Sequence, residues 1–239
     1  MKMKSDNTIY LPGTEKQFNH LKNNVNLGGQ EILIIGSNSV KIAEMFSDSG
    51  AKTITIIVED YESLINSRIL IDKGNSIIVR LMEFTNTDFI KDSFDIVYTQ
   101  ASISTKMRNK IVKEITRILK PEGILNVGEI TSLKLSPPKF INDIWGSGNI
   151  LPMNSDDIKK YYKERKFEVV DSLDLSAHLK DFYLESKKLL FNNIDSLSEN
   201  EKAYYKKLLK RMSHESNAYL KLGGKDYMGF TSIIARKVN

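Results

Sequence analysis

The sequence of 239 residues contains no cysteine. This absence excludes disulfide frameworks, thiolate zinc sites, iron–sulfur clusters and cysteine nucleophiles. Proline and glycine are also scarce, with 5 and 13 residues, whereas hydrophobic residues make up 41% of the chain and charged residues 27%. Such a composition is typical of a globular protein and not of a disordered or fibrous one. We expect a single domain over residues 1–239.

Long hydrophobic runs are also missing. No apolar stretch approaches the roughly 20 residues that a helix needs to cross a bilayer, and the first ten residues are polar and basic without the apolar centre of a signal peptide. We therefore expect a soluble, cytoplasmic protein with no membrane partner.

Positive charge is in slight excess, with a formal net charge of +5 and a pI near 9.1. Such an excess can indicate an acidic partner such as RNA, because clustered lysine and arginine attract phosphates. Here the lysines are spread along the sequence, and several lie beside acidic residues at helical spacing, as Lys160 and Glu164 do. This spacing favours a solvated surface, so nucleic acid is not the expected partner.

Short apolar runs alternate regularly with helical patterns along the chain. The runs predict strands over 31–35, 53–58, 76–81, 94–99, 124–130, 167–175 and 228–237. Helical patterns follow the first, second and fourth of these strands, and this alternation indicates a doubly wound α/β fold with a parallel sheet and helices on both faces. A helix is also expected before the first strand, where Thr14 and Gln17 form a capping-box pattern.

The second half of the chain is less regular. The stretch with Pro137, Pro138 and Trp145 is interpreted as an irregular loop, followed by a helix capped near Asn154 or Ser155. About 50 residues between the last two strands form two amphipathic helices, the second opening with a capping box at Ser198 and Glu201 and closing at 223–224. We divide the chain into an N-terminal helix (1–30), a core (31–175), a helical insert (176–222) and a final strand (223–239).

Two groups of residues follow the first two strands. In an open α/β sheet the ligand crevice lies outside the carboxyl ends of the strands. Gly36 allows close backbone approach, and Ser37 and Asn38 leave room for a ligand at the start of a helix, although a plain tight turn is an equal alternative. Glu59 and Asp60 come about 20 residues later, where a carboxylate can bind both hydroxyls of a ribose.

The segments ILIIGSNSV, VEDYESL, DSFDIVYTQASIS (92–104) and RILKPEGIL (117–125) together resemble the class I S-adenosylmethionine-dependent methyltransferases. The closest resemblance is to the small-molecule branch related to the ubiquinone and menaquinone methyltransferases, and it spans about residues 28–129. It implies a seven-stranded Rossmann-like sheet whose last strand is inserted antiparallel between the fifth and sixth. It also implies a transferase that methylates a small-molecule acceptor with S-adenosylmethionine as its cofactor.

By this resemblance Gly36, Ser37 and Asn38 line the methionine part of the cofactor, and Glu59 holds the ribose with Asp60 beside it. Four further residues complete the implied site, with two flanking the adenine (Met82 and Glu83) and two closing over the methionine side (Gln100 and Ala101). In-line methyl transfer requires no metal and no protein nucleophile, so no metal site is expected and no catalytic residue is assigned.

The chain also departs from the family pattern. The family usually has an acidic residue at the position of Ile34 and glycines at those of Asn38 and Val40. These departures support an alternative function, a methyltransferase-fold protein that binds a cofactor or partner without catalysis. An RNA or protein methyltransferase is a weaker alternative, because no RNA-binding module is appended and TQAS stands where base-methylating enzymes carry an Asn/Asp-Pro-Pro-Tyr/Phe motif. The helical insert is interpreted as a substrate lid, with homodimerisation as the rival.

Overall fold

The sheet and its helices are seen in a computed structural model, which describes residues 9–71, 76–193 and 213–238. The strands are β1 (Glu31–Ile35), β2 (Thr53–Val58), β3 (Ile77–Leu81), β4 (Phe94–Gln100), β5 (Leu119–Ser132), β6 (Met153–Asn154), β7 (Phe167–Asp174) and β8 (Met228–Lys237). The helices are α1 (Lys16–Asn24), α2 (Val40–Asp48), α3 (Tyr61–Leu70), α4 (Arg108–Ile118), α5 (Lys139–Ser147), α6 (Ile158–Lys163), α7 (Leu179–Asn193) and a helix over 213–221.

The strand order is β3-β2-β1-β4-β5-β8-β7, and the short β6 pairs with β5. β1 to β5 are parallel, whereas β8 runs antiparallel between β5 and β7. The predicted doubly wound α/β fold is confirmed, including the final strand inserted between its neighbours. The order reverses between β1 and β4, and such a switch point is where ligands bind in open α/β sheets.

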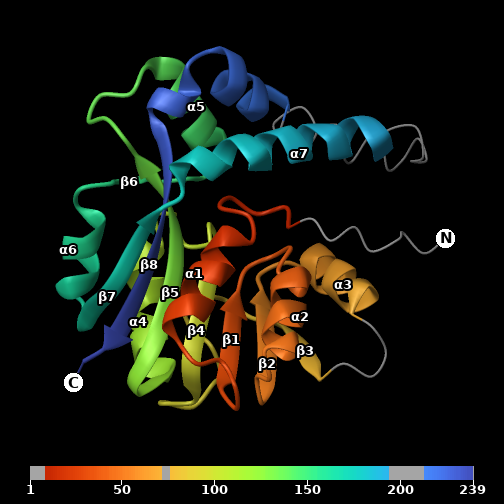
Figure 1. The fold of residues 1–239 in the computed structure, drawn as a ribbon, viewed down its shortest axis with the longest axis vertical. Helices are drawn as coiled ribbons and strands as arrows, with labels where there is room; N and C mark the ends of the chain where they lie inside the picture. The colour runs from red at the N-terminus through yellow and green to blue at the C-terminus, as the bar shows by residue number, and fades with distance from the viewer. Residues whose placement is uncertain (1–8, 72–75, 194–212, 239) are drawn as a thin grey trace.

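Both faces of the sheet are covered, as the alternation along β1 shows. Ile32 and Ile34 pack with residues of α1, α2 and α3, whereas Leu33 and Ile35 pack with residues of α4 and α6. In Figure 1, α1, α2 and α3 lie on the near face and α4 on the far face, while α5 and α7 lie beyond one end of the strands. Burial on both faces explains why these strands are continuous apolar runs.

The start of α1 differs from the prediction. The helix begins at Lys16, its N-cap residue is Glu15 without a side-chain cap, and Thr14 has a φ of 51°. Gln17 does not cap the helix, because its amide points into the sheet and donates to the carbonyl of Thr99 and to the side chain of Asn126, both at 3.0 Å. The predicted capping box is wrong, since the polar pair serves to dock α1 on the sheet.

Two further expectations for the second half need revision. The stretch interpreted as an irregular loop contains α5, which begins directly after Pro138 and buries Trp145. The helix expected near Asn154 begins at Ile158 without a side-chain cap at Asp157. In the described part of the insert, α7 and the helix over 213–221 are seen, and the latter ends before Gly223, which has a left-handed φ of 80°. The predicted capping box at Ser198 and Glu201 lies outside the described residues.

No helix in the described ranges is long and apolar enough to cross a membrane.

Candidate functional site

The switch point between β1 and β4, where a ligand crevice is expected, is built around Gly36. Its backbone N–H donates to the carbonyl of Ile57 (3.0 Å), which ties the end of β1 to β2. Its φ of 128° is a conformation that L side chains rarely adopt, and a Cβ on this residue would lie 1.9 Å from Oγ of Ser102, which follows β4. A glycine is therefore required here, because two loops meet with no space for a side chain.

The turn after Gly36 leads directly into α2. Ser39 closes it, since its hydroxyl donates to the carbonyl of Gly36 at 2.9 Å. Asn38 is exposed and has a φ of 61°. Asparagine is among the few non-glycine residues that accept this left-handed conformation. At the position where the family usually has glycine, the chain thus preserves a glycine-like backbone with a different residue.

This conformation predicts a stability effect at Asn38. Replacing Asn38 with valine should lower the free energy of unfolding by about 1–2 kcal/mol, because a β-branched residue is strained in the left-handed region. Ser37→Val is the matched control, since Ser37 precedes it in the same turn without a positive φ. Urea unfolding of both variants measures the difference, and equal losses would contradict the conformational explanation.

Glu59 and Asp60 follow β2 but have different surroundings. Asp60 is the N-cap of α3, and its carboxylate accepts from the backbone N–H of Ser63 at 2.7 Å. Glu59 is exposed, and its Oε1 accepts from the backbone N–H of Phe84 at 2.9 Å. In the described part of the chain no further hydrogen bond occupies the Glu59 carboxylate. Asp60 therefore has a structural role, while Glu59 retains an oxygen that can accept hydrogen bonds from a ligand.

Met82 and Glu83 follow β3, which is the neighbour of β2 in the sheet, and so they lie near Glu59. The backbone N–H of Met82 donates to the carbonyl of Val58 at 2.9 Å, extending the pairing of β2 and β3. The Met82 side chain is partly buried against the core, and Glu83 is exposed. The bond between Glu59 and Phe84 then fixes this loop beside the end of β2. The loop therefore has one apolar side chain and one charged side chain at the edge of the crevice.

Gln100, predicted to close over the methionine side of the cofactor, has its side chain engaged by other parts of the protein. It is buried, and its amide donates to the carbonyls of Pro12 (2.7 Å) and Thr14 (2.9 Å) while accepting from the Tyr98 hydroxyl (2.6 Å). Its side chain is committed to fixing the segment before α1 over the ends of the strands. Ala101, with a φ of 58°, turns the chain away from β4.

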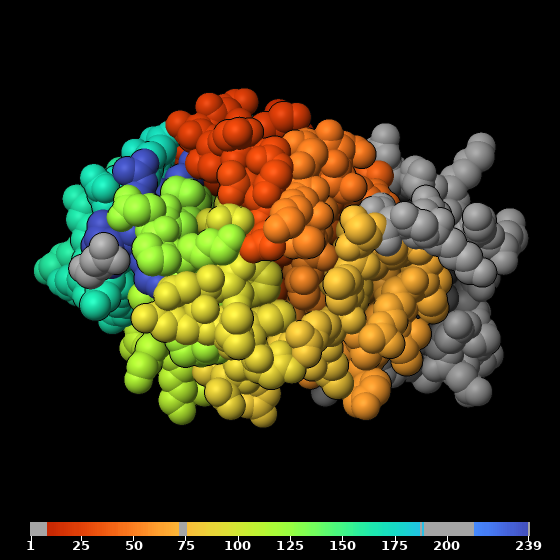
Figure 2. Space-filling view, turned by 90° about the horizontal axis from the view of Figure 1, so that it is seen from below, coloured from red at the N-terminus to blue at the C-terminus, as the bar shows by residue number. Residues whose placement is uncertain are grey.

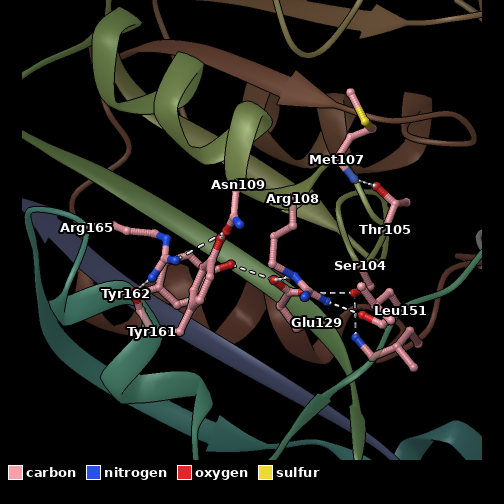
Figure 3. Close-up of polar contacts among 11 residues, drawn as sticks. Ser104, Thr105, Met107, Arg108, Asn109, Glu129, Leu151, Tyr161, Tyr162 and Arg165 are labelled. Atoms are coloured by element: carbon pink, nitrogen blue, oxygen red, sulfur yellow. Dashed lines mark hydrogen bonds and ion pairs between the residues drawn. The ribbon is translucent and has the colours of Figure 1, made fainter.

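A buried polar network that the sequence analysis missed supports the loop after β4 (Figure 3). Glu129, at the end of β5, is fully buried and accepts from Arg108 Nε (2.9 Å), the Tyr162 hydroxyl (2.7 Å) and the Ser104 hydroxyl (2.5 Å). Arg108 also donates to the carbonyl of Leu151. The signal in the sequence was a single acidic residue inside an apolar strand, which needs partners when buried.

His20 and Tyr183, two of the described titratable side chains, are buried in separate surroundings. His20 is buried between Ser232 (2.9 Å) and Asp171 (3.1 Å), and hydrogen bonding to His20 lowers the pKa of Asp171. No group of three or more histidine or acidic side chains in the described residues could hold a metal ion. Tyr183 is buried, and this burial raises the pKa of its hydroxyl far above the ordinary value.

The helical insert packs over the same end of the sheet. Leu179 and Tyr183 of α7 share an apolar cluster with Trp145 of α5 and Phe230 of β8, and Ala101 is partly buried against it. Figure 1 shows α5 and α7 together at this end. The insert therefore contacts the loop after β4, on the side of the crevice where Gly36 and Ser102 meet.

Residues 33–127 match a family model described as a methyltransferase domain. Among solved structures, the chain is similar to the (4+2)-cyclase SpnF, with a TM-score of 0.72 and 18% identity over 94% of this chain and 80% of that one. It is also similar to phosphoethanolamine N-methyltransferase 2 of Haemonchus contortus, solved with S-adenosylhomocysteine, at a TM-score of 0.76 and 14% identity, covering 94% of this chain and 53% of that one.

A third similar structure is geranyl diphosphate C-methyltransferase from Streptomyces coelicolor A3(2), with a TM-score of 0.67 and 12% identity over 94% of this chain and 77% of that one. A search of curated proteins gave no match. At these identities the similarity shows a shared fold. It does not indicate that this chain has the substrates of those proteins. The family model covers residues 33–127, and the solved structures share the fold of the whole described sheet, so the chain is similar to methyltransferase domains in both comparisons.

Proposed function

We propose that this protein transfers a methyl group from S-adenosylmethionine to a small-molecule acceptor. The observation that carries the proposal is the exposed carboxylate of Glu59, which lies at the end of β2 beside the glycine turn and has an oxygen without a protein partner among the described residues. A ribose offers the two hydroxyl donors that such a carboxylate accepts.

The remaining predicted residues fit the other parts of the cofactor. Gly36, Ser37 and Asn38 would line the methionine part at the start of α2, where backbone N–H groups favour a carboxylate. Met82 offers an apolar contact and Glu83 a polar one to the adenine. Ala101 and the backbone of Gln100 would close the opposite side, since the Gln100 amide already binds the segment before α1.

When bound, the cofactor supplies an electrophilic methyl group on a sulfonium. The protein then has to bind the acceptor, align it in line with that methyl group and exclude water, and such positioning can contribute several kcal/mol. The apolar cluster of α5, α7 and β8 against Ala101 suits an acceptor with apolar surface. We assign no general base.

Ligand-induced stabilisation tests the cofactor assignment. S-adenosylmethionine or S-adenosylhomocysteine should raise the melting temperature, because a ligand that binds only the native state stabilises it by mass action. Nicotinamide dinucleotides are the control and should produce no shift. No change at millimolar S-adenosylhomocysteine in a thermal unfolding assay would refute the assignment.

We further propose that the insert acts as a substrate lid, for which Phe182 provides a test. Phe182 is partly buried against the apolar cluster, whereas Leu184 on the same helix is an exposed neighbour. Phe182→Ala should reduce kcat/KM for the acceptor about tenfold while the Kd for S-adenosylhomocysteine is unchanged, because acceptor positioning is lost. Leu184→Ala should retain both values. If instead Phe182→Ala only converts a dimer into a fully active monomer, the insert is an oligomerisation element.

A protein of this fold that does not transfer methyl groups is the second candidate. It is favoured by Asn38, by the committed amide of Gln100 and by the similarity to a structure named as a cyclase. A turnover screen with labelled S-adenosylmethionine against phenolic, quinone-like, amine and RNA acceptors separates the two functions. Cofactor binding without transfer to any acceptor in the screen would favour the second candidate.

A further inference from the structure

A groove of about 920 Å³ runs along α4, from its first turn to the start of β5 and the end of β8. Its lining comes from α4, from the residues before β4, from the start of β5, from the turn between α6 and β7, and from the end of β8. Figure 2, seen from below, shows the yellow, green, blue and teal segments meeting on this face.

The groove gathers positive charge from separate parts of the sequence. Its lining contains seven lysine or arginine side chains and two carboxylates. The formal charge of the lining is therefore +5, which equals the formal net charge of the whole chain. Lys110 and Lys113 on α4 and Lys166 before β7 are exposed, and no carboxylate of the described ranges forms an ion pair with any of them. Three cations are therefore available to an external ligand.

The two carboxylates are already engaged by other cations of the lining. Asp92 binds Lys237 Nζ at 2.8 Å, and this hydrogen bond lowers the pKa of Asp92. Glu114 binds the Arg117 guanidinium at 2.6 Å. Neither carboxylate is then free to neutralise the three unpaired lysines, so the groove keeps its positive potential.

One cation is fixed in place. The Arg165 guanidinium lies 3.6 Å from the ring centroid of Tyr161, and it donates to the Tyr161 carbonyl (2.8 Å) and the Asn109 side chain (3.3 Å). Figure 3 shows this stack beside α4. A guanidinium held in this way loses little conformational entropy when it contacts an anion.

We propose that this groove binds the phosphodiester backbone of a single-stranded nucleic acid. A concave groove lined by cations follows a strand, whereas a flat bilayer surface could not reach cations on opposite walls. No aromatic residue is among the described residues that line the groove, and the ring of Tyr161 is stacked against the lining residue Arg165, so contacts to phosphates should dominate over base stacking. Binding should therefore tolerate many sequences and weaken steeply with salt.

This inference is independent of the methyl acceptor. Neither Gly36 nor Glu59 is among the residues that line the groove, so a bound strand would locate the enzyme on nucleic acid without occupying the proposed cofactor site. The lysines are scattered along the sequence, but the fold brings several of them together in the groove. Loss of nucleic-acid binding would therefore leave the proposed methyl transfer intact.

Fluorescence anisotropy with a labelled uridine oligonucleotide of about 12 nucleotides tests the proposal. The parent should bind with a log–log salt slope of roughly −2 to −3.5 between about 50 and 200 mM salt, as expected when three to five phosphates are neutralised on a single strand. Lys110→Glu with Lys113→Glu should weaken binding at least about tenfold and make the slope shallower. The control, Lys159→Glu with Lys160→Glu, makes the same charge change on exposed positions of α6 outside the lining, and should stay within about twofold.

Three results would overturn the proposal. The first is no binding by the parent at low salt, and the second is an equal loss in both double variants, which would show only a general charge effect. The third is lysine-dependent binding to phosphatidylserine vesicles or inorganic tripolyphosphate with none to the oligonucleotide. Thermal unfolding with S-adenosylhomocysteine shows in each case that both variants are folded and bind cofactor like the parent.

Discussion

Replacing Glu129 with alanine is expected to lower the free energy of unfolding by about 3–5 kcal/mol, because it leaves a buried charge without its partner. Arg108 is 7% exposed and its Nε donates to Glu129, so the guanidinium cannot turn to solvent without breaking its bond to Leu151. The hydroxyls of Ser104 and Tyr162 lose their acceptor in the same substitution. Urea unfolding measures the change.

Two control variants separate the charge from the hydrogen bonds. Tyr162→Phe removes one hydrogen bond and should cost only about 1 kcal/mol. Combining Glu129→Ala with Arg108→Met removes both charges and should recover a large part of the stability, since the unpaired guanidinium is gone. If the double variant is no more stable than Glu129→Ala alone, the loss does not come from the unpaired charge.

The same network should matter for the crevice. Ser104 lies two residues after Ser102, whose hydroxyl occupies the space that a side chain at Gly36 would need. The Ser104 hydroxyl also accepts a hydrogen bond from the backbone N–H of Ile130. Glu129 thus helps to fix the loop after β4 on β5. We expect Glu129→Ala to weaken S-adenosylhomocysteine binding as well, although Glu129 touches neither Gly36 nor Glu59.

Much of the fold could be predicted because its signals are local. Continuous apolar runs marked the strands, and β2 and β8 were predicted to the residue. The regular alternation with helices then left few possible topologies. The family resemblance supplied the antiparallel last strand. The helix α5 was not predicted, because the two consecutive prolines were interpreted as part of a loop. In the structure Pro138 is the N-cap residue of this helix.

The parts of the site that could not be predicted depend on contacts between distant residues. Gln17 looked like a capping residue, but it is drawn into the sheet by Thr99 and Asn126, 82 and 109 residues away. The bonds from Gln100 to Pro12 and Thr14 and the grouping of Lys113 with Lys166 are also long-range. A linear sequence shows which residues are charged, but not which of them share a surface.

The roles of Glu59 and Asp60 lead to opposite expected results for two neighbouring substitutions. Glu59→Ala should weaken S-adenosylhomocysteine binding about tenfold or more, because each charge-assisted hydrogen bond to the ribose is worth roughly 1.5–3 kcal/mol. Asp60→Ala should leave affinity nearly unchanged but lower stability by about 1 kcal/mol, since Asp60 caps α3 through Ser63. Calorimetric titration and urea unfolding of both variants give the two quantities.

A third variant tests whether the effect at Glu59 comes from the ligand or from the loop. Glu59→Gln keeps an oxygen that can accept from the Phe84 N–H, and so it should retain the loop beside β2. It loses the charge and one acceptor oxygen, so binding should still weaken, though less than in Glu59→Ala. If Glu59→Gln binds like the parent while Glu59→Ala does not, the residue acts by holding Phe84. If all three variants bind like the parent, the ribose lies elsewhere in the crevice.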